Sequence, residues 1–141
     1  MTPIDTFRAY FEAFEETYLD NNWDRIAPYF ASDITYKNAE GETLKGQTAA
    51  LDYLKTSVDS LDRRFDKREF IGLPDISASH DTITMDFTVR YQKDGVPDLL
   101  ISGKEVARFS GDQIQQMDDV FDDTTLADFA TWMEKYGALL A

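Results

Sequence analysis

Three segments in the second half of the chain alternate regularly between apolar and polar residues. They cover residues 82–92, 99–110 and 113–122, and turn sequences that read KDG and SGD separate them. A period of two places successive side chains on opposite faces of a β-strand. These segments therefore predict long antiparallel strands joined by tight connections. A weaker pattern over residues 63–79, which Pro74 interrupts, predicts one further strand ahead of them.

The first half of the chain has helical spacing instead. Apolar residues between Ile4 and Tyr18 recur at intervals of three and four, which predicts a helix that ends at residues 20–22. Residues 22–31 predict a second, short helix. Pro28 should kink this helix, because proline lacks the backbone N–H that a helix interior needs.

A short strand and a third helix complete the first half. Residues 33–38 alternate and predict the strand, and the polar residues 39–46 predict a loop. Thr48 can cap a helix over residues 48–61, because its hydroxyl can accept a free N–H group of the first turn. The apolar stripe of this helix should be buried.

The order of these elements predicts an α+β fold in a single domain that spans residues 1–141. Helices precede the run of strands, and an amphipathic helix over residues 124–140, capped by Asp123 or Thr124, follows it. Helices that cover one face of long antiparallel strands give a cone-shaped architecture. The apolar stripe of the last helix could either close the mouth of the cone or contact a partner subunit.

Charge and composition exclude several classes of function. The net charge of −13 argues against binding to nucleic acid or to an anionic membrane surface. The absence of cysteine excludes disulfides, thiolate metal sites and cysteine nucleophiles. The single histidine, His80, lies in a polar turn and should be solvated, so we expect neither a metal nor a cofactor. Without a basic n-region or a long apolar segment, the chain is expected to be cytoplasmic.

Glu105 has an unusual place in the strand over residues 99–110. The alternation puts its carboxyl group on the same face as Ile101 and Ala107, whereas Lys104 lies on the other face. If the apolar face lines a pocket, Glu105 is desolvated, which disfavours the charged form and can leave the group a proton donor. The alternative is a position at a rim, where Glu105 pairs with a lysine or an arginine.

Three stretches of the chain can be compared with known families by their order. They read NWDRIAPYFASDITYKN, LKGQTAALDYL and GDQIQQMDDVFDD. In this order they resemble the nuclear transport factor 2-like superfamily, which includes SnoaL-like polyketide cyclases and ketosteroid isomerases. The resemblance implies a cystatin-like cone, in which a curved antiparallel sheet wraps around the N-terminal helices, here with an extra C-terminal helix. It also implies a small-molecule pocket inside the cone and a homodimer that packs through the sheet.

The resemblance can be tested against the three groups that ketosteroid isomerases use. The pattern places Asn38 where the family has its general-base Asp, Phe14 where it has a Tyr of the oxyanion hole, and Glu105 where it has a protonated Asp. Asn cannot take up a proton at neutral pH, and Phe cannot donate one. Steroid-type isomerisation through that base is therefore excluded. Asn38 can still form a hydrogen bond to a carbonyl or hydroxyl group of a ligand.

Asp119 is the first candidate for a general base. It shares a strand face with Met117 and Phe121, which the family pattern directs inward, and Glu105 lies on the adjacent strand. Two neighbouring carboxyl groups push their pKa values apart, so that one can act as an acid and the other as a base. SnoaL-like cyclases are similar in using an Asp of the late sheet for proton transfer. We therefore expect Asp119 to take a proton next to a carbonyl, while Glu105 or Asn38 binds the developing oxyanion.

Other interpretations of the same residues remain open. Asp119 belongs to an acidic run whose charges could be solvated, and Asp122 should end the strand or cap the next helix. Epoxide hydrolases of a related branch need an Asp-Arg-Asp set, but Asp86 and Arg90 share the more polar face of their strand. A non-catalytic ligand-binding or dimeric assembly domain is the main alternative to an enzyme, because fold does not determine function.

A pocket inside the cone would have apolar and aromatic walls. It would suit a small apolar or aromatic ligand with one or two polar groups. The expected lining residues are Phe14, Trp23, Phe30, Tyr36, Leu54, Met85, Phe87, Met117 and Phe121.

Overall fold

A computed structural model describes residues 2–140 and has the α+β fold that the sequence predicts. Its helices are α1 (Pro3–Asp20), α2 (Gln47–Ser60) and α3 (Asp123–Tyr136), with four short 3-10 helices, η1 (Trp23–Arg25), η2 (Ala27–Tyr29), η3 (Asp62–Arg64) and η4 (Gly137–Leu140). Its strands are β1 (Phe30–Lys37), β2 (Thr43–Lys45), β3 (Lys67–Phe70), β4 (Asp75–Ser79), β5 (Thr82–Gln92), β6 (Leu99–Ser110) and β7 (Gln113–Phe121).

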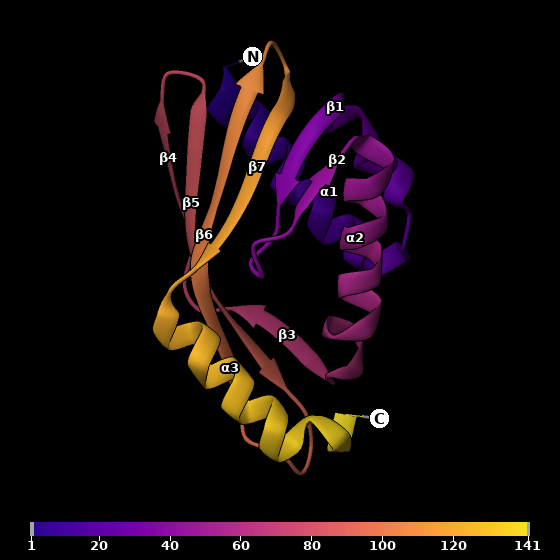
Figure 1. Cartoon of the computed structure of the whole chain (residues 1–141), viewed down its shortest axis with the longest axis vertical. Helices are drawn as coiled ribbons and strands as arrows, with labels where there is room; N and C mark the ends of the chain where they lie inside the picture. Colours follow the sequence, from indigo (N-terminus) through magenta and orange to yellow (C-terminus); the bar gives the residue numbers. More distant parts are fainter. Residues whose placement is uncertain (1, 141) are drawn as a thin grey trace.

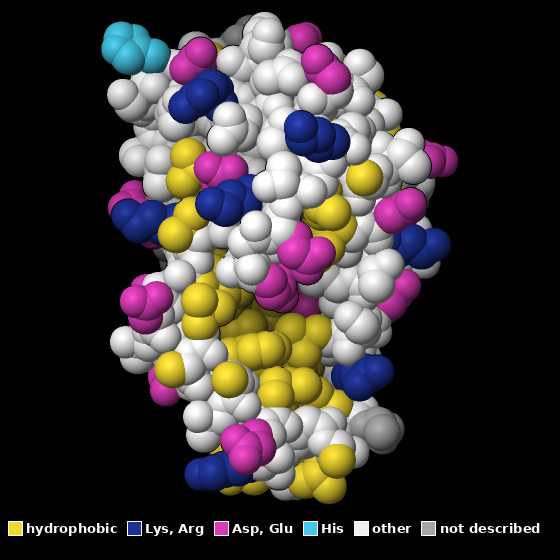
Figure 2. Space-filling model, in the orientation of Figure 1, with side chains coloured by type: hydrophobic (Ala, Val, Ile, Leu, Met, Phe, Trp, Pro, Cys, Tyr) yellow, Lys and Arg dark blue, Asp and Glu magenta, His cyan; other side chains and the backbone are white. Residues whose placement is uncertain are grey.

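The strands form one curved sheet in the order β2-β1-β7-β6-β5-β3, with β4 paired to β5. Neighbouring strands are antiparallel except for β1 and β7, which run parallel to each other. The sheet curves around α1 and α2, and α3 runs across the far end of its long strands (Figure 1). On this side the molecule is hollowed, and hydrophobic side chains line the hollow (Figure 2).

Helix α1 begins and ends where its residue types favour it. Thr2 Oγ1 accepts the backbone N–H of Asp5, and the Asp5 carboxylate accepts the N–H of Thr2, which satisfies two free donors of the first turn. At the other end Asn21 adopts a left-handed conformation (φ 61°), and its N–H donates to the Thr17 carbonyl at 2.7 Å.

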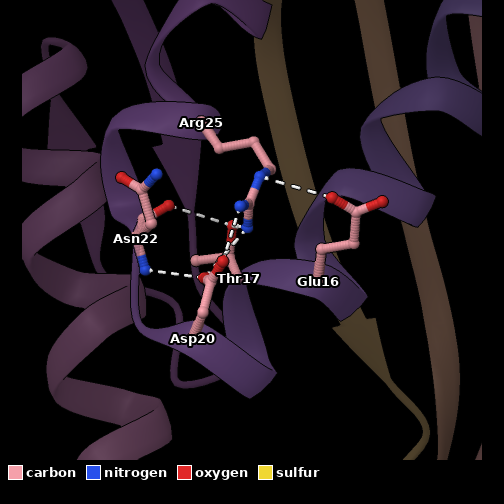
Figure 3. Close-up of polar contacts among 5 residues, drawn as sticks. All are labelled: Glu16, Thr17, Asp20, Asn22 and Arg25. Atoms are coloured by element: carbon pink, nitrogen blue, oxygen red, sulfur yellow. Dashed lines mark hydrogen bonds and ion pairs between the residues drawn. The ribbon is translucent and has the colours of Figure 1, made fainter.

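Arg25 links the turn after α1 to the end of that helix (Figure 3). Its guanidinium donates to both carboxylate oxygens of Asp20, at 2.9 and 2.6 Å, and lies 3.4 Å from Oε2 of Glu16. It also donates to Thr17 Oγ1, which in turn donates to the carbonyl of Asn22. The hydrogen bonds from Arg25 are the main cause that lowers the pKa of Asp20 to about 2. These contacts set the direction in which the chain leaves α1 towards β1.

The segment over residues 22–31, predicted as one short helix, consists of two 3-10 turns and the start of a strand. The turns η1 and η2 meet at Ile26, which is fully buried, and β1 begins at Phe30. Pro28 lies inside η2 and has no N–H to donate to an α-helical ladder. The chain therefore forms tight turns here rather than a kinked helix.

The loop predicted over residues 39–46 contains β2, which pairs with β1. Helix α2 follows directly after Gly46, which has φ 95°, so Thr48 is not the cap that the sequence suggested. A positive φ of this kind favours glycine, because it has no Cβ. The buried face of α2 includes Leu54 and Val58, as its apolar stripe predicts.

Helix α3 covers a second hydrophobic cluster at the far end of the sheet. Its N-cap is Asp122, whose Oδ1 accepts the N–H of Thr125 at 2.7 Å, and not Asp123 or Thr124. Trp132 is buried against Phe65, and its Nε1 donates to a backbone carbonyl of the loop between β5 and β6. The apolar stripe of α3 therefore packs on its own chain at this end of the molecule.

The face of the sheet that points away from the helices exposes some large apolar residues, among them Leu100 and Val120. The homodimer that the resemblance implies would use this face, and it stays a prediction. None of the helices in residues 2–140 combines the length and the apolar character needed to cross a lipid bilayer.

Candidate functional site

A cavity of about 230 Å³ lies between the sheet and its helices. Strands of the sheet form one wall, α1 and α2 form the other, and α3 contributes its first turns. An engineered apolar cavity of about 150 Å³ holds benzene, so this cavity has room for a ligand of about two fused rings. In Figure 2 it opens as a hollow with hydrophobic walls and acidic side chains at its edge.

Glu105 on β6 and Asp119 on β7 both border this cavity. They are direct partners in the antiparallel register of the two strands, so their side chains are neighbours. Ala107 and Met117 lie on the same face and are fully buried, which fixes the face that points inward. Within residues 2–140 neither carboxyl group has an ion pair with a lysine or an arginine. Glu105 and Asp119, hereafter the carboxyl pair, are thus adjacent as the sequence predicts.

Tyr36 on β1 contacts the carboxyl pair directly. Its Oη donates to Oδ2 of Asp119 at 2.5 Å, and the side chain is 1% exposed. Burial raises the pKa of Tyr36 well above its usual range, and the charges of Asp119 and Glu105 raise it further. The Tyr36 hydroxyl therefore keeps its proton and acts as a donor. Tyr10 on α1 borders the same part of the cavity, and burial raises its pKa as well.

The two carboxyl groups of the pair differ in their affinity for a proton. Burial raises the pKa of Glu105 well above its usual range, and the charge of Asp119 raises it further. Burial also raises the pKa of Asp119, to about 6, although the hydrogen bonds from Tyr36 and Glu105 oppose this shift. Of the two groups, Glu105 therefore binds a proton more tightly than Asp119, and Asp119 is the first to ionise as the pH rises.

Asn38, predicted as a third catalytic residue, forms part of a turn. It is 2% exposed, and its Oδ1 accepts the N–H groups of Glu40 and Glu42 at 3.1 and 3.0 Å. Its own carbonyl accepts the N–H of Gly41. The side-chain oxygen is thus occupied in shaping the connection between β1 and β2. Asn38 does not border the cavity, and a catalytic role for it stays a prediction.

Most of the predicted lining residues border the cavity, namely Phe14, Tyr36, Leu54, Met85, Phe87 and Phe121. Trp23, Phe30 and Met117 do not border it. Phe30 and Met117 are fully buried in the core. The ring of Trp23 packs edge-on against Phe14, and its Nε1 donates to Oδ1 of Asn21 at 2.8 Å.

A second polar cluster in the same cavity was not predicted from the sequence. Arg68 on β3 donates from Nη1 to Oε1 of Glu15 at 3.0 Å, and its Nε lies 3.3 Å from Oδ2 of Asp62. Tyr91 on β5 donates to the same oxygen of Asp62 at 3.3 Å. The Arg68 side chain is one-tenth exposed, and its guanidinium lies over the ring of Tyr18. Glu15, Asp62, Arg68 and Tyr91, hereafter the Arg68 cluster, all border the cavity.

The Arg68 cluster and the carboxyl pair lie at opposite ends of the cavity. Met85 is the partner of Glu105 across β5 and β6, and Tyr91 lies six residues further along β5. At a rise of about 3.3 Å per residue, the backbone positions of the two ends are about 20 Å apart. Burial raises the pKa of Asp62 to about 6, and the Arg68 charge opposes this shift.

The residues considered for an epoxide-hydrolase site lie on the other face of the sheet. Asp86 is 3.7 Å from Lys104, Arg90 pairs with Glu69, and neither Asp86 nor Arg90 borders the cavity. The part of the chain that the structure describes contains no group of three or more His, Asp or Glu side chains that could hold a metal ion.

The sequence from residue 7 to residue 117 matches the family model of the SnoaL-like domain. The chain belongs to the SnoaL-like family. The resemblance noted in the sequence is thereby confirmed. A search of curated protein sequences gives no significant match.

Solved structures with the same fold come from several bacteria. A nuclear transport factor 2-like protein of unknown function from Burkholderia pseudomallei is 18% identical, with 94% of this chain and 98% of that chain covered and a TM-score of 0.71. A protein assigned as a polyketide cyclase from Xanthomonas campestris is 12% identical (93% and 98% covered, TM-score 0.67). An LEH-like epoxide hydrolase from M. tuberculosis is 17% identical (94% and 92% covered, TM-score 0.60). At such identities the likeness shows the fold alone.

Proposed function

We propose that this SnoaL-like protein is a cofactor-independent enzyme that transfers a proton next to the carbonyl group of a small, largely apolar substrate. The carboxyl pair carries the proposal, because it offers one protonated and one ionised carboxyl group side by side at a cavity. Proton transfer at carbon needs a base for the proton and an acid for the developing charge on oxygen. Isomerisation or cyclisation of this kind consumes no oxidant or reductant.

Asp119 is the general base in this proposal. Its carboxylate takes the proton from the carbon beside the carbonyl. The electron pair of the C–H bond forms the C=C bond of the enolate, and the π pair of the C=O bond moves onto the oxygen. The Oη donor of Tyr36 orients the carboxylate and favours its ionised form. Asp119 then returns the proton to another carbon in an isomerisation. In a cyclisation, the enolate carbon attacks a second carbonyl of the same molecule, and the new alkoxide takes up the proton.

Glu105 is the acid of the pair. Its protonated carboxyl group donates a hydrogen bond to the enolate oxygen, so the negative charge forms against a donor that is already in place. A charged Glu105 would repel that oxygen. The raised pKa of Glu105 is therefore a requirement of the mechanism and follows from its burial beside Asp119.

The alternative of a non-catalytic domain predicts a filled pocket and a Glu105 paired with a basic residue at its rim. The open cavity and the absence of such an ion pair in residues 2–140 favour an enzyme or a ligand-binding protein over an assembly domain, and proton exchange distinguishes the first two.

The proposal is tested by proton exchange on a bicyclic ketone. 2-Tetralone fits the size of the cavity and has exchangeable protons beside its carbonyl, which proton NMR follows in deuterated buffer. We expect the wild-type protein to accelerate the exchange and Asp119→Asn to lower the acceleration by about 100- to 10,000-fold, the range for loss of a general base.

Asp118→Asn is the matched control, because Asp118 precedes Asp119 on β7, faces away from the cavity and does not border it. This variant should exchange 2-tetralone at the wild-type rate. An Asp119→Asn variant that is folded and as fast as the wild type would refute the proposed base. Equal losses in both variants would point to an effect of net charge instead of general-base catalysis.

A further inference from the structure

We propose that the Arg68 cluster is a binding subsite for a hydroxyl group, so that the cavity selects elongated ligands with a polar group at each end. The inference deepens the proposed function and rests on it for the end that meets the carboxyl pair. The inference adds that the substrate carries a hydroxyl group at the end that meets the Arg68 cluster.

Arg68 provides the first argument, because it has a hydrogen-bond donor to spare. Among the described residues, its Nε is buried without a hydrogen-bond partner. Oδ2 of Asp62 lies 3.3 Å from this atom, but the N–H does not meet it with hydrogen-bond geometry. Nη1 is already occupied by Glu15. The N–H groups of Nη2 also form no hydrogen bond within the described residues, and unlike Nε this atom keeps accessible surface, so an oxygen atom of a ligand in the cavity can accept from it.

The charges of the cluster provide the second argument. The Arg68 guanidinium lies between the carboxyl groups of Glu15 and Asp62. An anionic ligand group would meet two carboxyl groups, and a cationic one would meet the guanidinium. A neutral hydroxyl avoids both penalties, since it can accept an Nη2–H and donate to a carboxylate oxygen of Asp62. The chemistry therefore favours a group that both donates and accepts.

The wall between the two ends provides the third argument. Phe87 and Val89 follow Met85 on the same face of β5, and Phe70 and Phe129 border the same cavity from β3 and α3. None of these side chains offers a hydrogen bond. A ligand that reaches from the carboxyl pair to the Arg68 cluster must therefore be apolar in the middle and polar at both ends.

Equilibrium binding of matched phenols tests this inference without any need for turnover. A phenol oxygen resembles an enol oxygen, so 2-naphthol is the probe for the end at the carboxyl pair. 2,6-Dihydroxynaphthalene adds a hydroxyl at the far end, and 4-phenylphenol with 4,4′-dihydroxybiphenyl forms a longer pair. In calorimetric titrations of the wild-type protein, we expect the second hydroxyl to tighten binding by about tenfold in the pair whose length fits, as for one hydrogen bond to a charged group. The methyl ether of that second hydroxyl should lose most of this gain, because it cannot donate.

Two variants test whether the gain in affinity from the second hydroxyl comes from the Arg68 cluster. Arg68→Lys keeps a positive charge between the two carboxyl groups but removes the Nη2–H donors, and should reduce the gain to about twofold or less. Tyr91→Phe removes the hydroxyl that holds Asp62 and should reduce the gain to about threefold. Arg63→Met is the matched control, because Arg63 also lies over the ring of Tyr18 but does not border the cavity. It should keep the full gain.

The outcomes separate this inference from the proposed function. If the second hydroxyl brings no gain in either pair, or if the gain persists in both Arg68→Lys and Tyr91→Phe, the inference is wrong. If Arg68→Lys does not fold, the gain in affinity of the wild type and its reduction in Tyr91→Phe still test the inference. A wild-type protein that exchanges 2-tetralone but shows no gain refutes the subsite alone, whereas a gain without exchange refutes the proposed reaction alone. Hydrolysis of styrene oxide that is lost in Asp62→Asn would make the cluster a reactive site and overturn its role in binding.

Discussion

The two ends of the cavity hold buried carboxyl groups in opposite ways. At the carboxyl pair, Glu105 and Asp119 face each other with tyrosine hydroxyls nearby, and neither has a basic partner among residues 2–140. At the Arg68 cluster, two carboxyl groups share one guanidinium. Without a countercharge, burial and the neighbouring charge of Asp119 favour the protonated form of Glu105, and this proton is available for chemistry. An acid held by an arginine can stay ionised, and its remaining hydrogen-bonding capacity serves recognition.

The two ends of the cavity should therefore differ in how much stability a substitution costs. In the carboxyl pair, an amide can replace the protonated Glu105 as a hydrogen-bond donor, and the charge beside it stays the same. The Arg68 cluster depends on its central cation. The predictions below separate these two forms of burial, beginning with the largest effect on stability.

Removal of the central cation should have the largest effect on stability. In Arg68→Met the carboxyl groups of Glu15 and Asp62 lose their partner, which costs about 3–5 kcal/mol of unfolding free energy for a broken buried ion pair. Glu105→Gln replaces a protonated carboxyl group by an amide of similar shape, so its cost should stay within about 1 kcal/mol. Urea denaturation at neutral pH measures both. A larger loss in Glu105→Gln than in Arg68→Met would contradict the comparison.

The second largest effect should be a change in the pH dependence of stability in Asp119→Asn. The pKa of Asp119 is about 6 in the folded protein against 3.8 as its ordinary value, so the folded state is penalised as the group ionises. The associated stability is complete below pH 3.8 and is lost as the pH rises through 6. Between about pH 4.5 and about pH 7.5, the wild type should therefore lose about 2 kcal/mol relative to Asp119→Asn.

The carboxylate of Asp122, at the start of α3, should have the opposite effect on the pH dependence of stability. The N–H of Thr125 holds the pKa of Asp122 below its usual value, so this carboxylate stabilises the fold above its ordinary pKa and ceases to do so in acid. Asp122→Ala should therefore lose more stability at about pH 7.5 than at about pH 3. Melting curves of the wild type and both variants over this range would show whether the two trends diverge.

The smallest expected effect distinguishes two tyrosines that each donate to a buried carboxyl group. Tyr36 donates to Asp119 at 2.5 Å, and Tyr91 donates to Asp62 at 3.3 Å. Loss of the shorter bond should raise the pKa of Asp119 and move the acidic limb of the exchange profile with 2-tetralone upward by about one pH unit in Tyr36→Phe. Tyr91→Phe should leave the midpoint of that limb in place. An equal displacement in both variants would mean that the two ends are electrostatically coupled.

The carboxyl pair could be predicted from the sequence because it lies on regular strands. The alternation of residues 82–92 and 99–110 matches β5 and β6 to the residue, and residues 117–121 alternate on β7. A bulge at Gln115, between the pairs Phe109–Ile114 and Arg108–Gln116, sets the register that makes Glu105 the partner of Asp119. The donor on Asp119 was not predicted. Tyr36 was expected only as a wall residue, because its approach depends on the parallel pairing of β1 with β7.

The Arg68 cluster could not be found from the pattern of one sequence. Its members come from α1, η3, β3 and β5, and the segment around Arg68 has too weak an alternation to show which face points inward. Their contact depends on how far the sheet curves around α1, which is a property of the packed fold. Local signals also failed at Thr48 and at residues 22–31, where glycine and proline determine the backbone.

The most direct test of the account is a carbon-13 NMR titration of the carboxyl groups of Glu105 and Asp119. We expect the Glu105 carbon to titrate far above the ordinary value of 4.5 and above the Asp119 carbon, which should titrate near pH 6. In Asp119→Asn, the Glu105 titration should move downward, because the neighbouring charge is gone. If both carbons of the wild-type protein instead titrate together near pH 4, the pair holds no proton at neutral pH, and the proposed acid does not exist.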